Sequence, residues 1–193
     1  KELAKALAYT RQVQAMSFLN DETENIYTYG ASSYGLLETN HPLVNGGTWR
    51  NRRDNDVVLG QEALEDAIQA YGSEMVDLRG RKINVEPALL MHGPADRFLV
   101  NRLLMSAQRA ESADNDINPL KNLNIKPLLN RHLTNDNRWF LLPPKQNHRL
   151  KFWDRNKAFM KKVDSGSNWN VRMMAYQRYS KGAASAEGIW GSY

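Results

Sequence analysis

At 193 residues, 41% of them hydrophobic, the chain is long enough to bury the core of one domain or two small ones, which argues against intrinsic disorder. It contains no cysteine, which excludes disulfides and cysteine-ligated metal and is typical of a protein that folds in a reducing cytoplasm. No apolar run of about 18 residues is present and the first residues lack the apolar core of a signal peptide, so the sequence predicts neither a membrane span nor secretion.

The net charge of +5 is compatible with a nucleic-acid partner, but basic and acidic residues are largely interleaved and no dedicated basic arm is evident. Three short clusters could still contact phosphate through counterion release. They comprise Arg50, Arg52 and Arg53; Arg79, Arg81 and Lys82; and Lys157, Lys161 and Lys162. A solvated surface is the simpler interpretation of each cluster.

The N-terminal residues 1 to 19 are predicted to form a helix, because Leu3, Leu7 and Val13 lie on one stripe and neither Gly nor Pro interrupts it. Alanines widen this stripe, so we expect the helix to be covered on more than one side. The chain begins inside the helix without a cap, and we therefore expect Lys1 to be an internal residue of a longer protein.

Residues 27 to 56 are rich in Gly, Asn, Ser and Thr, which predicts an extended segment with many turns. A helix is predicted over residues 61 to 71, because apolar residues recur at helical spacing from Leu64 onwards, and Gly72 is its predicted stop. The short apolar run at residues 88 to 91 predicts a buried strand.

A third helix is predicted over residues 94 to 108, beginning at a proline. Its expected inner face comprises Ala95, Leu99, Leu103 and Ala107. The polar residues 111 to 124 predict an exposed loop, and residues 125 to 130 and 139 to 142 are predicted to form a pair of strands around a turn. Both faces of the second strand are apolar, so we expect it to be central in a sheet with Trp139 buried.

Aromatic residues crowd into the last third of the chain, which predicts that β structure dominates there. Residues 169 to 180 alternate with period two, which predicts a long strand with one buried face. That face comprises Trp169, Val171, Met173, Ala175 and Tyr179. Met174 and Tyr176 interrupt the polar side, which favours a strand that contacts neighbours on both faces.

No constellation of catalytic residues is evident, since the chain has no P-loop, no dinucleotide glycine fingerprint and no His-Glu-x-x-His helix. Four scattered histidines fit loop or core positions better than a metal site. They are His41, His92, His132 and His148. We therefore predict no catalytic, cofactor-binding or metal-binding residue, no cofactor, and a protein that is not an enzyme.

The aromatic and basic mixture from Lys151 to Arg155 is compatible with stacking on single-stranded nucleic acid. Packing within a sheet that has a polar edge is the simpler interpretation, because the aromatic residues continue along the chain without matching basic partners.

Several segments, taken in chain order, resemble the major head subunits of Mu-type prophages and the wider HK97-like capsid family. Residues 2 to 13 are similar to the end of that family's spine helix, and residues 37 to 43 contain a similar Thr-Asn-His-Pro-Leu segment. Residues 85 to 95 resemble a buried strand that ends at a Pro and a helix start. The most specific likeness is Leu-Thr-x-x-x-x-Trp within residues 128 to 142. Residues 169 to 193 resemble the long peripheral strand and the closing strand, although Ala-Glu-Gly replaces the frequent Asp-Trp-Arg-Gly.

The resemblance implies an α+β fold of the HK97 type, with an axial (A) and a peripheral (P) domain, a spine helix and long β-strands. It assigns residues 1–58 to the spine-helix end and a peripheral-domain segment, residues 59–144 to the axial domain, and residues 145–193 to a return into the peripheral domain. The implied function is that of a major capsid protein, which self-assembles as pentamers and hexamers into the icosahedral shell of the virion.

The expected partners are other copies of the chain and packaged double-stranded DNA, bound without sequence specificity, with portal, scaffold and decoration proteins as further candidates. The resemblance implies assembly in the host bacterial cytoplasm and no membrane partner. An encapsulin-like nanocompartment shell, which shares the fold but encloses a cargo enzyme, is the alternative. A small nucleic-acid-binding module is a third hypothesis, for which a salt-dependent DNA affinity of the free subunit is expected.

Overall fold

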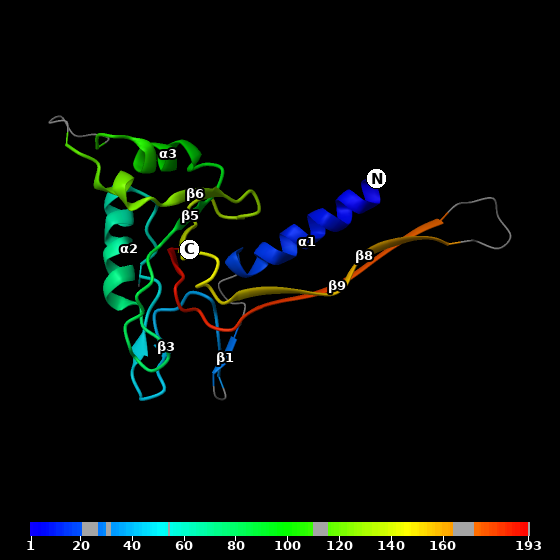
Figure 1. The fold of residues 1–193 in the computed structure, drawn as a ribbon, viewed down its shortest axis with the longest axis horizontal. Coiled ribbons are helices and arrows are strands. Elements are labelled where there is room, and N and C mark those ends of the chain that lie inside the picture. Colours follow the sequence, from blue (N-terminus) through cyan, green and yellow to red (C-terminus); the bar gives the residue numbers. More distant parts are fainter. Residues whose placement is uncertain (21–26, 30–31, 54, 110–115, 164–171, 193) are drawn as a thin grey trace.

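The computed structural model describes residues 1–20, 27–29, 32–53, 55–109, 116–163 and 172–192. It shows a mixed α+β protein with a body and a projecting arm (Figure 1). The body contains helices α2 (Gln61–Glu74) and α3 (Arg97–Met105) and a four-stranded sheet. The arm consists of helix α1 (Glu2–Asn20) and a hairpin of two long strands, β8 (Leu150–Val163) and β9 (Arg172–Ala183).

The sheet of the body has the strand order β10-β7-β5-β6, with bounds Trp190–Ser192, Trp139–Leu142, Leu89–His92 and Lys126–Leu129. The three predicted strands of the middle segment are confirmed to within two residues. Their predicted pairing is wrong, because β5 lies between β6 and β7, parallel to the first and antiparallel to the second. The more apolar β5 takes the inner position, while the half-exposed β6 lies at the edge.

Strand β7 is central, as predicted, and all four of its residues are buried. Trp139 is 2% exposed, and its indole Nε1 donates a hydrogen bond of 2.9 Å to the carbonyl oxygen of Val57. Apolar side chains on both faces of a strand require cover on both faces, and the surrounding core supplies that cover.

The edge strand β10 comes from the end of the chain and pairs antiparallel with β7. Its Gly191 lies where a side chain has no room. A Cβ there would be 2.7 Å from the Cδ1 atoms of both Leu37 and Phe140 and 3.1 Å from the carbonyl oxygen of Trp139. The segment predicted to return to the peripheral strands therefore also supplies one strand of the body's sheet.

Helix α2 packs Leu64, Ala67 and Tyr71 into the core. The predicted stop at Gly72 is wrong, because the helix continues through Glu74 and ends where Met75 is buried in an extended conformation. A glycine inside a helix costs only about 1 kcal/mol relative to alanine. Burial of the Met75 side chain contributes more than this, so the helix continues past Gly72 and ends next to Met75.

Helix α3 is shorter than the predicted span of residues 94 to 108. Its buried residues are Val100, Leu103 and Leu104, so the predicted inner face is wrong for Ala95 and Ala107, which are exposed. The helix ends before Ser106, because the side-chain amide of Asn118 donates hydrogen bonds to the carbonyl oxygens of Leu103 and Ser106. These are carbonyls that a helix end leaves unpaired.

The segment predicted as an exposed loop at residues 111 to 124 is partly ordered into a 3-10 helix at Pro119–Leu123. Leu120 in this helix is buried, and the side chain of Asn118 caps it by accepting a hydrogen bond of 3.1 Å from the Leu120 backbone N–H. Residues 111–115 of the predicted loop lie outside the described part of the chain.

The predicted turn-rich segment before α2 contains two short hairpins. Strands β1 (Tyr27–Tyr29) and β2 (Ser32–Tyr34) form the first, and β3 (His41–Pro42) and β4 (Thr48–Trp49) form the second. The second turn places both Gly46 and Gly47 at positive φ, which few other residues tolerate.

In the arm, α1 and the predicted dominance of β structure are confirmed. The predicted buried face of the long strand is only partly correct. Ala175 and Tyr179 are half-buried, but Met173 is 56% exposed because it lies nearer the hairpin tip than Gln177, which is bonded to α1. Residues 169 to 171 lie outside the described part of the chain.

We predict that Trp139→Ala lowers the free energy of unfolding by about 3 to 5 kcal/mol, because it leaves a large cavity in the central strand. Trp139→Phe, which keeps one aromatic ring but removes the hydrogen bond to Val57 and part of the indole volume, should cost less. Urea unfolding followed by fluorescence or circular dichroism measures both. An unchanged midpoint for Trp139→Ala would show that this side chain does not stabilise the sheet.

Candidate assembly surface

Helix α1 covers one face of the hairpin in the arm. The α1 helix lies along the hairpin, where Gln177 Nε2 donates a hydrogen bond of 3.1 Å to the Leu7 carbonyl oxygen. Arg11 pairs with Asp154 at 2.6 Å and lies 4.9 Å from the ring centroid of Phe152. These contacts place Phe152, Asp154 and Gln177 on the hairpin face toward α1.

Among the described residues, no such layer covers the opposite face of the hairpin. Residues opposite each other in an antiparallel pair share a face, and the pairs Trp153↔Ser180, Phe159↔Tyr176 and Lys161↔Met174 alternate with those that face α1. We define the outer face of the arm by the members that the structure describes. They are Lys151, Trp153, Asn156, Phe159, Lys161, Val163, Arg172, Met174, Tyr176, Arg178, Ser180 and Gly182.

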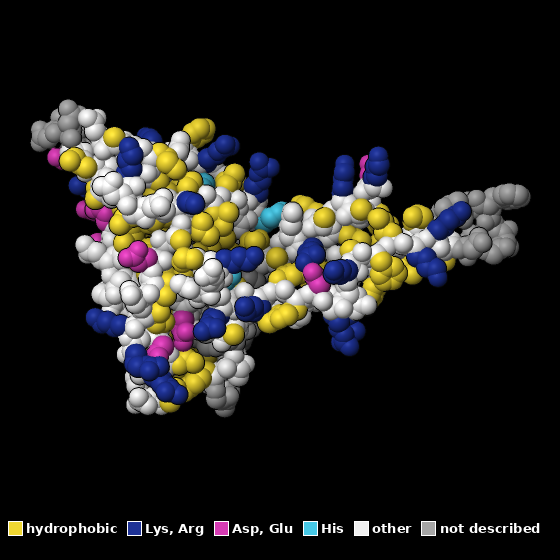
Figure 2. Space-filling model, viewed as in Figure 1, with side chains coloured by type: hydrophobic (Ala, Val, Ile, Leu, Met, Phe, Trp, Pro, Cys, Tyr) yellow, Lys and Arg dark blue, Asp and Glu magenta, His cyan; other side chains and the backbone are white. Residues whose placement is uncertain are grey.

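The outer face exposes large apolar side chains. Trp153, Phe159, Met174 and Tyr176 are 53, 47, 48 and 41% exposed. The rings of Phe159 and Tyr176 lie 5.6 Å apart, so they form one aromatic pair across the hairpin. Figure 2 shows hydrophobic side chains along the arm with Lys and Arg between them. A monomeric soluble protein rarely leaves a continuous apolar patch without a partner.

The hairpin is also strongly basic. Its two strands contain eight Lys or Arg residues and one acidic residue, Asp154, which Arg11 neutralises. The chain as a whole has 26 basic and 21 acidic residues, so the remainder carries more acids than bases. The sequence-based expectation that no basic arm exists is therefore wrong, because β8 and β9, which follow each other in the chain, pair into one arm that carries these cations.

The arm is joined to the body where α1 ends. The buried guanidinium of Arg138 donates to the carbonyl oxygens of Leu19 and Asn20, which are acceptors that the end of a helix leaves unpaired. The Asn20 amide donates to the His132 carbonyl oxygen at 2.6 Å and accepts from the Thr134 N–H at 3.0 Å. A cation at this end also favours the helix dipole.

A second junction inside the body is centred on Asn51, whose side chain is fully buried. Its Oδ1 accepts hydrogen bonds of 2.9 Å from the Glu38 N–H and from His41 Nε2. Its Nδ2 donates to the carbonyl oxygens of Leu36 at 2.9 Å and Ala186 at 3.4 Å. Because Asn51 Oδ1 is an acceptor, His41 carries its proton on Nε2.

Burial of His41 disfavours the charged imidazolium and lowers the pKa of this side chain from 6.5 to about 4, despite the hydrogen bond to Asn51. The ring also stacks on Trp49 with centroids 4.5 Å apart. His41 is therefore a neutral structural residue at physiological pH.

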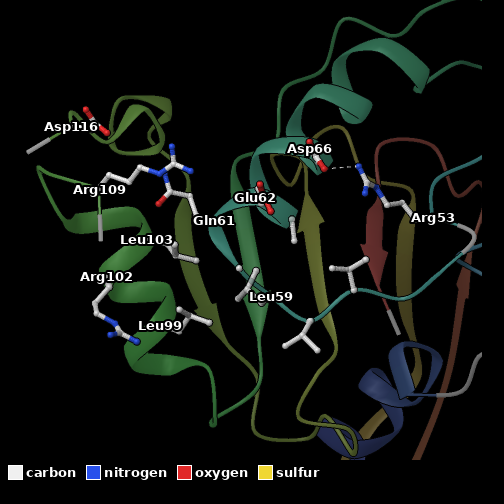
Figure 3. A pocket seen from close by; sticks show the side chains of 14 residues that line it. Arg53, Leu59, Gln61, Glu62, Asp66, Leu99, Arg102, Leu103, Arg109 and Asp116 are labelled. Atoms are coloured by element: carbon white, nitrogen blue, oxygen red, sulfur yellow. Dashed lines mark hydrogen bonds and ion pairs between the residues drawn. The ribbon is translucent and has the colours of Figure 1, made fainter. Parts of the chain in front are cut away.

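The body carries a groove of about 900 Å³ between the start of α2 and α3 (Figure 3). Apolar side chains from both walls line it, namely Val57, Val58, Leu59, Leu99 and Leu103. Charged side chains lie around it, namely Arg53, Glu62, Asp66, Arg102, Arg109 and Asp116. Arg53 and Asp66 form an ion pair at 2.9 Å, whereas the Glu62 carboxylate has no partner among the described residues.

The four histidines occupy separate environments. His41 is bonded to Asn51, the buried His92 lies with Nδ1 2.7 Å from the Gly93 carbonyl oxygen, and His132 packs edge-on to Tyr9 at 5.5 Å. Burial lowers the pKa of His148, and the charges of Lys151 and Lys145 lower it further. Within the described ranges, no group of three or more His, Asp or Glu side chains could hold a metal ion.

Two of the basic clusters considered from the sequence contain ion pairs. Arg50 pairs with Glu74 at 2.6 Å, Arg52 with Asp56 at 2.8 Å, and Arg81 with Asp77 at 2.8 Å. The third cluster, at residues 157 to 162, lies on β8 of the basic hairpin.

A comparison with models of known protein families and one with curated proteins each found no match. None of the helices among the described residues is long and apolar enough to cross a membrane. Function must therefore be argued from the surfaces of the molecule itself.

Sequence reasoning found Met174 and Tyr176 as apolar residues on the polar side of the long strand, but it found neither the rest of the outer face nor Asn51. Two register shifts in β8, between Asp154 and Asn156 and between Asn156 and Phe159, break the period-two signal that defines the outer face. Asn51 lies in a segment rich in polar turn residues, so nothing in its local pattern distinguishes it from a surface asparagine.

We predict that His41 makes the folded protein less stable in mild acid. Because its pKa is lower in the folded than in the unfolded state, the stabilisation is complete above pH 6.5 and is lost as the pH falls toward 4. Between pH 7.5 and pH 5 the loss is about 2 kcal/mol. His41→Gln, whose amide can still donate to Asn51, should reduce this dependence in urea unfolding. His132→Gln is the control. If the free energy of unfolding fell equally with pH in the wild type and in His41→Gln, His41 would not be the source of the acid sensitivity.

Proposed function

We propose that the protein is a shell-forming subunit, the major capsid protein of a tailed bacteriophage with the HK97-like fold that its sequence resembles. The observation that carries the proposal is the arm, whose outer face leaves Trp153, Phe159, Met174 and Tyr176 about half exposed. The hairpin of β8 and β9 gains stability by packing against α1, and the apolar side chains of its outer face have no such layer among the described residues. Neighbouring copies in a closed shell would supply the missing layer.

The division into arm and body fits this proposal. In this proposal, α1 with β8 and β9 would form the spine-helix end and long strands of the peripheral domain, and the body with its sheet would form the axial domain. Figure 1 shows the arm projecting from the body, so an arm of this reach can lie across a neighbouring copy. Heterologous contacts of this kind close into rings when the rotation between neighbouring copies closes.

The free energy for assembly comes from the apolar surface that the arm leaves open. Burial contributes roughly 25 cal/mol per Å² of apolar surface. Helix α1 adds further exposed apolar surface at Leu3 and Tyr9, which are 40 and 61% exposed. The predicted cover on more than one side of α1 is therefore expected from another subunit. In this function the protein needs no catalytic residue, and the virion is its site of action, with packaged double-stranded DNA inside.

We predict that Phe159→Asp weakens self-association by about tenfold or more, because it places a carboxylate in the aromatic centre of the outer face. Asn156→Asp is the matched control, since it adds the same charge to the same face without removing apolar surface. Sedimentation velocity over a range of concentrations measures both variants. Equal association of the wild type and Phe159→Asp would show that the outer face does not contribute to assembly.

A nucleic-acid-binding module is the second candidate, and the composition of the outer face favours it. Lys151, Lys161, Arg172 and Arg178 are interleaved there with aromatic side chains, and no carboxylate lies among the described members of this face. Cations that bind phosphate beside aromatic rings that stack on bases are typical of single-strand binding.

For this candidate, the free subunit should bind a single-stranded oligonucleotide with an affinity that falls steeply with salt, and Trp153→Ala and Arg178→Gln should each weaken binding. Fluorescence anisotropy at several salt concentrations measures this. If the subunit assembles but shows no measurable affinity for the oligonucleotide at low salt, nucleic-acid binding is ruled out as a function of the outer face.

A further inference from the structure

Helix α3 presents an apolar ridge to solvent. Phe98 is 78% exposed and Met105 is 53% exposed. Residues seven apart lie on the same side of a helix, so these two side chains share one face, with Asn101 and Arg102 between them and the exposed Arg97 next to Phe98 in the chain. We call Arg97, Phe98 and Met105 the α3 ridge. No described residue forms an ion pair or side-chain hydrogen bond with Arg97.

The groove between α2 and α3 is complementary to such a ridge. Its walls are apolar at Val58, Leu99 and Leu103, and its volume of about 900 Å³ can accept an aromatic side chain. Glu62, at the start of α2, lies at the groove with a free carboxylate (Figure 3). The chain therefore carries an apolar ridge beside a free cation and an apolar groove beside a free anion.

We propose that the α3 ridge of one copy docks into the groove of a second copy, with Arg97 of the first facing Glu62 of the second. This rests on the proposed shell function, because both copies belong to one ring of subunits. Consecutive helix residues project about 100° apart, so Phe98 points away from the groove that Leu99 lines. A chain cannot fill its own groove in this way, so the contact requires a second copy.

The charges around the groove favour a second copy over a nucleic acid. Arg53, Arg102 and Arg109 lie there, but so do Glu62, Asp66 and Asp116. A phosphate backbone requires a surface of one sign, whereas a mixed rim around an apolar centre is typical of protein interfaces. The free Arg97 and Glu62 give one specific pair of opposite charges.

Charge reversal tests this pair. Arg97→Glu and Glu62→Arg should each lower the association of the purified protein at least tenfold, because each places two like charges in the contact. The double variant should recover most of the wild-type association. An equimolar mixture of the two single variants should also recover it, since each ridge then meets an opposite charge. Arg79→Glu, a reversal at an exposed arginine away from α3, is the control and should assemble normally.

Sedimentation and negative-stain electron microscopy follow assembly, and melting temperatures confirm that each variant is folded. Full assembly of both single variants, or failure of the double variant and of the mixture to recover, would overturn the ridge and groove contact. Phe98→Ser provides an independent measurement and should weaken association without lowering the melting temperature. A wild type that stays monomeric would instead remove the shell function itself, so the two failures are distinguishable.

Discussion

The buried carboxamide of Asn51 is the interaction on which the body depends. All four of its side-chain hydrogen bonds join separate pieces of chain, from Leu36 and His41 on one side to Ala186 on the other. The Asn51 carbonyl oxygen also accepts from the N–H of Gly191, so β10 is held at the sheet edge beside β7. A buried amide that lost these partners would leave unsatisfied groups, each at a cost of about 1 to 3 kcal/mol.

This junction determines where the arm can lie. The end of β9 runs directly into the segment that Asn51 holds, and α1 is fixed independently where Arg138 and the Asn20 amide bind its last turn. Both layers of the arm, the helix α1 and the hairpin of β8 and β9, are thus attached to the body. A rigid attachment matters for the proposed function, because an arm held in one direction presents its outer face in the same orientation in every subunit. Apolar surface that is preorganised in this way loses little entropy on assembly.

Elements with strong local periodicity could be predicted from the sequence, including α1, the start of α2, and strands β5 and β7. Their ends and partners could not, because tertiary contacts decide them. Met75 extends α2 beyond Gly72, Asn118 ends α3 early, and β5 inserts between two strands that are closer to each other in sequence. The candidate assembly surface was hidden for a related reason. Its aromatic and basic residues come together only when β8 and β9 pair, with two bulges that interrupt the alternation.

The central claim is that copies of this protein cover one another's arms in a closed assembly. Electron microscopy and light scattering of the purified protein, over a range of salt and protein concentrations, test it most directly. We expect rings of subunits or closed shells of uniform size, in which the outer face of each arm is covered by a neighbour. A strictly monomeric protein under all of these conditions, folded and with its arm exposed, would contradict it.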